Sequence, residues 1–87
     1  MLYQVKLSAQ AAKELRELPN KKVQRQVVRR LEALAADPRP RGCRKLGEDI
    51  YRIRSGNYRV VYCVRDEEVL VLVLRIGDRK SVYRDPS

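Results

Sequence analysis

The sequence predicts an α+β domain in which a helical hairpin packs on a mainly antiparallel four-stranded sheet, in the order β-α-α-β-β-β. Two observations predict this fold. Apolar residues recur at helical spacing between residues 8 and 37, whereas apolar and polar residues alternate with a period of two before and after that stretch. A chain of 87 residues has the size of one folding unit, so we expect a single domain over residues 1–87.

The N-terminal half predicts one strand and two helices. A short strand is predicted over residues 2–7, where apolar and polar side chains alternate. Ser8 is a suitable N-cap for a first helix that Pro19 ends, and Asn20 is a suitable N-cap for a second helix that ends at Asp37 and Pro38. The second helix is expected to bury an apolar stripe made of Val23, Val27, Leu31 and Leu34.

The C-terminal half predicts a loop followed by three strands. Prolines, glycines and cations predict a loop over residues 37–47. Strands are then expected at residues 50–54, 58–64 and 69–76, separated by turns at 55–57 and 66–68. The last of these strands is almost entirely apolar, so we expect it to be buried on both faces. Gly77 permits a bend before a final short strand or tail.

Charge and residue usage restrict the possible functions. The formal net charge is +9 and the pI is about 10.1, so polyanions are the expected partners, nucleic acid before acidic proteins. The sequence contains no histidine. This excludes a histidine general base, a pair of catalytic histidines, and nucleophiles activated by histidine.

The two cysteines and the hydropathy pattern predict an intracellular protein without a metal. Cys43 and Cys63 are too few for a disulfide scaffold and too far apart for half of a zinc site. The longest apolar run, residues 69–74, is far shorter than the roughly 20 residues that cross a bilayer. No N-terminal apolar stretch precedes a cleavage site, so we expect no signal peptide. We therefore expect a cytoplasmic protein with free thiols, no membrane partner, no cofactor and no metal ligands.

Three arginines form the first candidate site. Arg52 and Arg54 alternate along one strand, so they project to the same side about 6.6 Å apart, close to the phosphate repeat of a single strand of nucleic acid. Arg59 follows the turn and can pair beside them across the hairpin. A merely solvated charged face is the simpler interpretation of two such arginines. Three like charges together would repel one another, which favours an anion-binding site.

The second candidate site follows Gly77 and consists of Arg79, Lys80, Tyr83 and Arg84. Arginine presents a planar set of donors that suits phosphate but does not act as a base at neutral pH. Tyr83 is suited to stack on a nucleobase or to exchange a proton through its hydroxyl, and packing of a C-terminal aromatic ring is the alternative. Asp78 can orient Arg79, act as a weak base, or cap a turn, and the last role is the most common one.

The remaining aromatic, thiol and acidic residues are expected to be structural. Tyr51, Tyr58 and Tyr62 fit core or sheet packing, and Cys63 fits a buried, inert thiol. The acids at residues 66–68 fit a solvated turn.

The sequence resembles the RelE/ParE superfamily of bacterial and archaeal toxins. The residues that carry the resemblance are YRIRSGNYRVVYCV and VLVLVLRIGDRKSVYR, and the resemblance covers essentially the whole chain. The family pattern is G-x-Y-R-[VL]-[VI]-Y, then an apolar strand, glycine, arginine and a closing V-Y. In this sequence the pattern falls on Gly56, Tyr58, Arg59, Val60, Val61, Tyr62, Gly77, Arg79, Val82 and Tyr83.

The resemblance is to the RelE branch, and it implies a toxin that enters the ribosomal A site and cleaves the mRNA being translated, without a metal. In the implied reaction a ribose 2′-OH attacks the adjacent phosphate. By matched position, Arg59 and Arg79 correspond to arginines that bind the phosphate and the transition state, and Tyr83 to a catalytic tyrosine. Arg52 and Arg54 replace two lysines near the scissile phosphate. Further RNA contacts are expected from Arg44, Lys45, Lys80 and Arg84.

The resemblance also implies partners. These are a cognate antitoxin, usually encoded next to the toxin, the 70S ribosome with its mRNA and rRNA, and operator DNA reached only through the antitoxin. Two departures from the family pattern matter: Asp78 stands where many relatives have histidine or lysine, and Arg52 and Arg54 exchange protons less readily than lysines. A ParE-type gyrase inhibitor and a catalytically weak module that binds antitoxin and DNA are the alternative functions.

Overall fold

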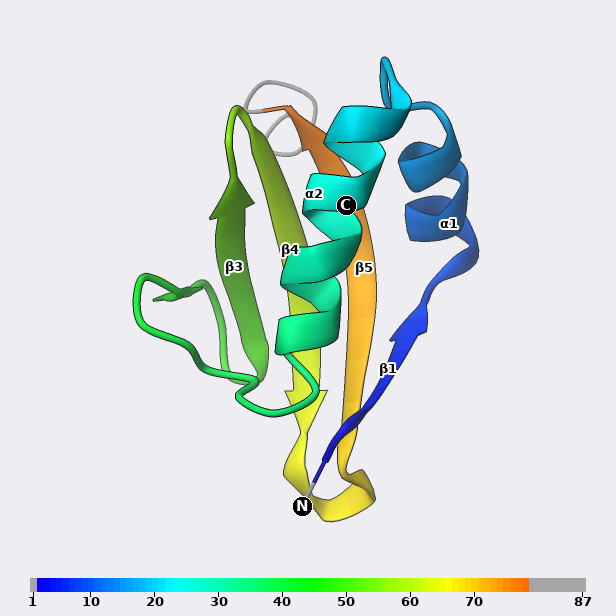
Figure 1. The fold of residues 1–87 in the computed structure, drawn as a ribbon. Helices are drawn as coiled ribbons and strands as arrows, with labels where there is room; N and C mark the ends of the chain where they lie inside the picture. The colour runs from blue at the N-terminus through cyan, green and yellow to red at the C-terminus, as the bar shows by residue number, and fades with distance from the viewer. Residues whose placement is uncertain (1, 79–87) are drawn as a thin grey trace.

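The computed structural model describes residues 2–78. Its elements are, in chain order, β1 (Gln4–Leu7), α1 (Ala9–Arg16), α2 (Lys21–Ala33), β2 (Arg44–Lys45), β3 (Ile50–Ser55), β4 (Tyr58–Arg65), the short 3-10 helix η1 (Asp66–Glu68) and β5 (Leu70–Asp78). The strands form one sheet in the order β1-β5-β4-β3-β2. The α2 helix runs across the front of β4 and β5, with α1 beside it next to β5 (Figure 1).

The sheet is mainly antiparallel, as predicted, but in the described residues it has five strands rather than four. β1 pairs in parallel with β5, and the other three pairings are antiparallel. The additional strand, β2, lies inside the stretch expected to be a loop, and it pairs Arg44 with Arg52 and Lys45 with Tyr51. A strand of two residues is too short to show a periodic pattern in the sequence, so it could not be predicted. The pairing arises because the loop folds back along the free edge of β3.

Both predicted helix N-caps are confirmed. The Ser8 hydroxyl oxygen accepts a hydrogen bond from the Ala11 amide at 3.0 Å, and the Asn20 side chain accepts one from the Val23 amide at 2.9 Å. Both helices end a few residues before the prolines that were expected to end them, because the last turns relax into turn geometry ahead of each proline. Within residues 2–78, neither helix is long and apolar enough to cross a membrane.

The core lies between the helices and one face of the sheet. Tyr62 is fully buried, and its hydroxyl donates a hydrogen bond of 2.7 Å to the Pro38 carbonyl. Its ring stacks on Tyr51 with centroids 5.9 Å apart. The predicted core positions of Tyr51 and Tyr62 are confirmed, and half-buried Tyr58 packs against the same core. The other fully buried side chains include Val27, Leu34, Ile53, Val60, Val64, Val71, Val73 and Ile76.

The last described strand differs from the expectation in two ways. Val71, Val73 and Ile76 are buried, but the leucines between them are only half-buried. β5 is therefore fully covered on one face alone, because the helices pack on that face. Gly77 does not mark a bend, since β5 continues through it to Asp78.

Candidate functional site

A tight hairpin joins β3 and β4 and sets the register of the candidate arginines. Ser55 pairs with Tyr58, so two residues connect the strands. Gly56 adopts a φ of +61°, a conformation that hairpin turns of this length reserve for glycine. The same register places Arg54 directly opposite Arg59. The predicted cross-strand approach of Arg59 is confirmed for Arg54, whereas Arg52 pairs with Val61, two residues further along β4.

Four arginines lie close together on the face of the sheet opposite the helices. On β3 and β4 the residues that alternate with them, such as Ile53 and Val60, are buried on the helix side. Arg44 extends the set, because it pairs with Arg52 across β2 and β3. Three neighbouring strands therefore bring together Arg44, Arg52, Arg54 and Arg59, which we call the arginine face.

The members of the arginine face differ in exposure. Arg54 and Arg44 are exposed and Arg59 is half-buried, whereas Arg52 is only 7% exposed. The simpler interpretation of Arg52 and Arg54 as a merely solvated charged face therefore does not hold for Arg52. Arg52 lies between Arg44 of β2 and Val61 of β4, whereas at Arg54 the described residues pair with β3 on the β4 side alone. A partly dehydrated guanidinium interacts more strongly with an anion than an exposed one does.

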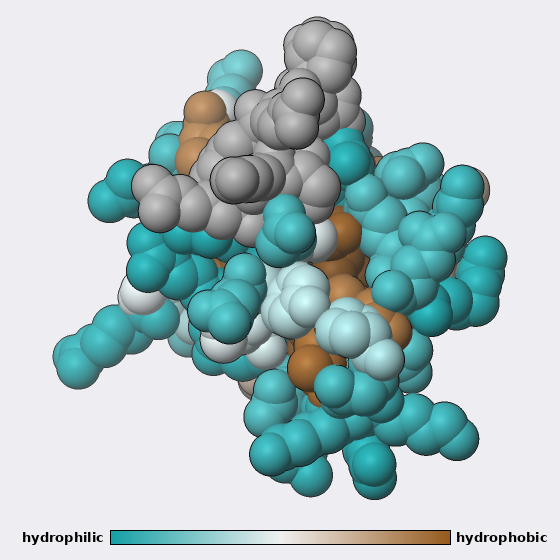
Figure 2. Space-filling view, turned by 90° about the horizontal axis from the view of Figure 1, so that it is seen from above, coloured by the Kyte–Doolittle hydropathy of each residue, from teal (hydrophilic) through white to brown (hydrophobic). Residues whose placement is uncertain are grey.

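A further cation reaches the hairpin from the helical layer. The Arg30 guanidinium of α2 donates a hydrogen bond of 3.1 Å from Nε to the Arg54 carbonyl. Figure 2 views the molecule from the hairpin end, where the coloured side chains are mostly hydrophilic and apolar ones show only between them. Arg30 therefore adds a cation next to the hairpin that carries Arg54.

The structure does not bring all the predicted site residues together. Lys45 pairs with Tyr51, so the alternation along β2 places it on the sheet face opposite the arginine face. The second candidate site, made of Arg79, Lys80, Tyr83 and Arg84, lies outside the described residues. β5 leads toward that site, because Gly77 pairs with Arg59 and Asp78 pairs with Tyr58.

Comparison with known proteins identifies the family. The family model described as the ParE toxin of the type II toxin-antitoxin system parDE matches residues 5–83. The chain belongs to the RelE/ParE family of toxins. The match includes every residue of the arginine face and extends through Tyr83.

Curated relatives of this RelE/ParE-family chain carry RelE names. The mRNA interferase toxin RelE of Escherichia coli K12 is 36% identical over 90 residues, which is 98% of this chain and 94% of the relative. A putative RelE-like toxin protein, also from E. coli, is 34% identical over 88 residues, covering 95% of this chain and 92% of the relative.

Solved structures share the fold. A mutant of E. coli RelE in the free state superposes with a TM-score of 0.82 at 34% identity, covering 98% of this chain and 94% of that one. RelE from an archaeal RelE–RelB complex of Pyrococcus horikoshii gives a TM-score of 0.77 at 31% identity, covering 91% and 97%. The RelBE2 toxin–antitoxin complex of Mycobacterium tuberculosis gives 0.79 at 28% identity, covering 91% and 93%.

A polar bridge between α1 and β5 of the toxin fold was not predicted from the sequence. Glu14 accepts hydrogen bonds from the Arg75 guanidinium at 2.9 and 3.0 Å and from the Ile76 amide at 2.8 Å. Burial alone would raise the pKa of Glu14, but the hydrogen bonds from Arg75 and Ile76 outweigh it and lower the pKa. The signal available in the sequence was an acid among the apolar positions of α1.

A second missed network lies at the opposite end of the sheet from the hairpin. The acids at residues 66–68 are exposed, as predicted, but Asp66 accepts hydrogen bonds from Arg39 at 2.8 and 3.2 Å and from the Tyr3 hydroxyl at 2.6 Å. These bonds, with Arg39 contributing most, lower the pKa of Asp66. The Arg39 guanidinium also lies 5.3 Å from the centre of the Tyr51 ring. The network ties the predicted loop to the first strand.

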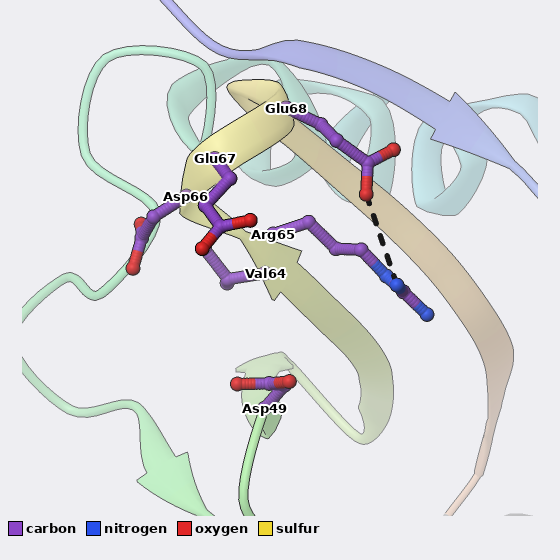
Figure 3. A pocket seen from close by; sticks show the side chains of 6 residues that line it. All are labelled: Asp49, Val64, Arg65, Asp66, Glu67 and Glu68. Atoms are coloured by element: carbon purple, nitrogen blue, oxygen red, sulfur yellow. Dashed lines mark ion pairs between the residues drawn. The ribbon is translucent and has the colours of Figure 1, made fainter.

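An acidic pocket of about 320 Å³ lies beside this network (Figure 3). It is lined by Asp49, Val64, Arg65, Asp66, Glu67 and Glu68. Arg65 pairs with Glu68 at 3.7 Å across the pocket. Its four carboxylates give the pocket the wrong charge for a nucleic acid.

Proposed function

We propose that this RelE/ParE-family chain is a type II toxin that cleaves translated mRNA in the ribosomal A site. The observation that best supports this proposal is the arginine face, where three strands bring four guanidinium groups together. Because the sequence contains no histidine, a nuclease of this kind must rely on such cations. The mRNA interferase name of relatives that are 36% identical over nearly the whole chain supports the same reaction.

The reaction is an internal transesterification. The ribose 2′-oxygen forms a bond to the adjacent phosphorus as the bond from phosphorus to the 5′-oxygen of the next nucleotide breaks. The 2′-hydroxyl gives up a proton and the leaving 5′-oxygen receives one, which yields a cyclic phosphate and a free 5′-hydroxyl. The pentavalent intermediate carries extra negative charge, and preorganised guanidinium groups stabilise it.

The arginine face supplies this electrostatic stabilisation in our proposal. Arg59 lies between β3 and β5 and contacts the scissile phosphate, with Arg54 opposite it. The buried Arg52 strengthens the local field, and exposed Arg44 binds the flanking RNA backbone. Arginines hold protons too tightly to exchange them at neutral pH. Proton transfer therefore falls to another group.

The C-terminal residues complete the proposed site. By their match to the family pattern, Arg79 binds the transition state and Tyr83 exchanges the proton, while Lys80 and Arg84 bind RNA. Lys45 contacts RNA from the other face of the sheet, so its contribution to cleavage is smaller than that of Arg44.

The proposed partners are a cognate antitoxin and the ribosome. RelE–RelB complexes from an archaeon and from bacteria support an antitoxin that neutralises this chain. Operator DNA is reached through that antitoxin. The 70S ribosome supplies the mRNA and excludes water from the site, which places the action in the cytoplasm.

Mapping of mRNA ends tests the proposed function. The chain is produced without antitoxin and added to a reconstituted translation reaction, and primer extension locates new 5′ ends on the mRNA. We expect cleavage within translated codons and none when ribosomes are omitted. Intact mRNA in the complete reaction, with the protein folded, would overturn the proposal.

Gyrase inhibition is the second candidate function, because the matching family model is described for the ParE toxin. Such a toxin would block supercoiling of plasmid DNA by purified gyrase and leave translated mRNA intact. The same protein preparation is tested in both assays, so the outcome separates the two functions.

A further inference from the structure

Among residues 2–78, the edge of β5 that faces β1 has a strand partner only as far as Val73. β1 pairs with residues 70–73 of β5 and then ends at Leu7, whereas β5 runs on to Asp78. An uncovered strand edge leaves backbone groups without partners and weakens the strand. The residues concerned directly precede the segment that carries Arg79 and Tyr83.

Groups of Ser8, the N-cap of α1, and of Glu14, in its second half, take the place of a neighbouring strand. The Ser8 amide donates to the Val73 carbonyl at 2.8 Å, and the Ser8 hydroxyl donates to the Leu74 carbonyl at 3.0 Å. Further along, one oxygen of Glu14 accepts from the Ile76 amide at 2.8 Å. The backbone of β5 therefore continues to find partners beyond the end of β1.

The second carboxylate oxygen of Glu14 binds the side chain of Arg75, the residue of β5 that precedes Ile76. It accepts from Arg75 Nε at 3.0 Å and from a terminal nitrogen of Arg75 at 2.9 Å. The side chains of Glu14 and Arg75 are only 12% and 21% exposed, so solvent screens this ion pair far less than a surface pair. One carboxylate thus holds two consecutive residues of β5.

The residues held in this way adjoin the arginine face. Val61 pairs with Arg75 and Arg59 pairs with Gly77, so the restrained part of β5 lies beside Arg59. A shift of this strand would move both the neighbour of Arg59 and the point at which the chain passes Asp78. In catalysis that depends on positioned charges, a displacement of about 1 Å can lower the rate 100-fold.

We propose that Glu14 is a positioning residue of the toxin: its carboxylate substitutes for a neighbouring strand and holds β5 in place beside Arg59. This inference rests on the proposed function, because it assigns Glu14 a part in mRNA cleavage without contact to RNA. Glu14→Asp shortens the side chain, Glu14→Gln keeps an acceptor for the Ile76 amide but loses the charge, and Glu14→Ala removes both.

Single-turnover cleavage on mRNA-programmed ribosomes tests the inference, with the rate constant and the ribosome affinity measured separately. Each variant is assayed at a temperature where circular dichroism gives the same folded fraction as wild type. We expect Glu14→Ala to lower the rate constant at saturating ribosomes at least about tenfold, with affinity within about twofold of wild type. Glu14→Gln should recover part of the loss. Glu17→Ala, which removes an exposed acid from the end of α1, is the matched control.

The possible failures are distinguishable. A wild-type rate for folded Glu14→Ala would overturn the positioning role while leaving the proposed function intact. A loss confined to affinity would overturn it as well. If wild type itself does not cleave, the proposed function fails, and the inference fails with it. Faster amide hydrogen exchange at Ile76 and Gly77 in Glu14→Ala, but not in Glu17→Ala, is the structural signature expected alongside the lower rate constant.

Discussion

Arg54 of β3 and Arg59 of β4 lie directly opposite each other, two residues from a tight turn. Side chains in such a pair have Cβ atoms about 5 Å apart, and like charges placed there destabilise a sheet by roughly 0.2–1 kcal/mol. A phosphate between the two guanidinium groups would reverse the sign of this interaction. The arrangement therefore predicts that stability and activity change in opposite directions when one charge is removed.

Replacement of Arg54 with glutamine tests this relationship. We expect the free energy of unfolding to rise by a few tenths of a kcal/mol, because the repulsion across the hairpin is relieved. The single-turnover rate constant for mRNA cleavage should fall about tenfold or more, since a charged donor to the phosphate is lost. Urea denaturation and primer extension measure the two effects. The control is Arg29→Gln, which removes an exposed cation from α2 and should change neither the stability nor the rate constant. If Arg54→Gln lost both stability and activity, the prediction would be contradicted.

Binding of the toxin to ribosomes should depend strongly on salt. Each cation that neutralises a phosphate releases a counterion, so the logarithm of the binding constant falls linearly with the logarithm of the salt concentration. We expect the slope for Arg44→Gln to be less steep than that of wild type by about one. Filter-binding assays of toxin and ribosomes at several potassium concentrations give both slopes. An unchanged slope would remove Arg44 from the RNA-binding surface.

Tyr62→Phe should destabilise the fold without direct effect on chemistry. The hydroxyl of Tyr62 is buried and donates to the Pro38 carbonyl, and the mutation leaves that buried acceptor without its donor. A cost of about 1–3 kcal/mol follows, measured by urea denaturation. Tyr58→Phe is the control at a half-buried position, with an expected change within about 0.5 kcal/mol. Equal stability of the two variants would show that the hydrogen bond to Pro38 contributes little.

Arg79→Ala and Tyr83→Phe should each relieve growth arrest while leaving antitoxin binding intact. The reason is chemical: the first removes a guanidinium from the proposed transition-state site, and the second removes only the hydroxyl that exchanges a proton. Growth after induction and copurification with a tagged antitoxin measure the two properties. Full toxicity of both variants would defeat the catalytic assignment.

The local rules of sequence and structure predicted much of this fold. Ser8 and Asn20 cap helices because each offers a side-chain oxygen to a free amide, and this requirement is visible in the sequence. The hairpin register followed from the turn at Gly56. The two residues of β2 could not be predicted, because their pairing depends on the free edge of β3, which is a property of the assembled sheet.

The candidate site, like the fold, was predictable from the sequence only where it depends on neighbouring residues of one strand or one turn. Alternation along one strand and a short turn place Arg54 beside Arg59, so local rules suffice. The burial of Arg52 depends on strands on both sides of it, and the bridge from Glu14 to Arg75 joins residues 61 positions apart. Contacts of that range follow from packing of a helix on a sheet edge, and no periodic pattern in the sequence encodes them.

Glu14 should make the stability of the toxin depend on pH in the acid range. Its pKa in the folded protein lies below the ordinary value of 4.5, because the hydrogen bonds from Arg75 and Ile76 favour the ionised form over the opposing effect of burial. The unfolded chain therefore binds the proton more readily than the folded one, and stability falls as the pH decreases. The stabilising contribution is complete above the ordinary value and is lost as the pH falls through the lower, folded-state value. Glu14→Gln has no proton to bind at this position.

The difference in unfolding free energy between wild type and Glu14→Gln isolates this contribution, because the shift at Asp66 is present in both proteins and cancels. We expect the difference to be constant from about pH 7 to about pH 5 and to shrink at lower pH. Urea denaturation followed by circular dichroism at a series of pH values gives the profile. Glu32→Gln, which removes an exposed carboxylate from α2, is measured alongside as the control. A difference that grows on acidification would mean that Glu14 is held in its protonated form, and the bridge to Arg75 would then not be an ion pair.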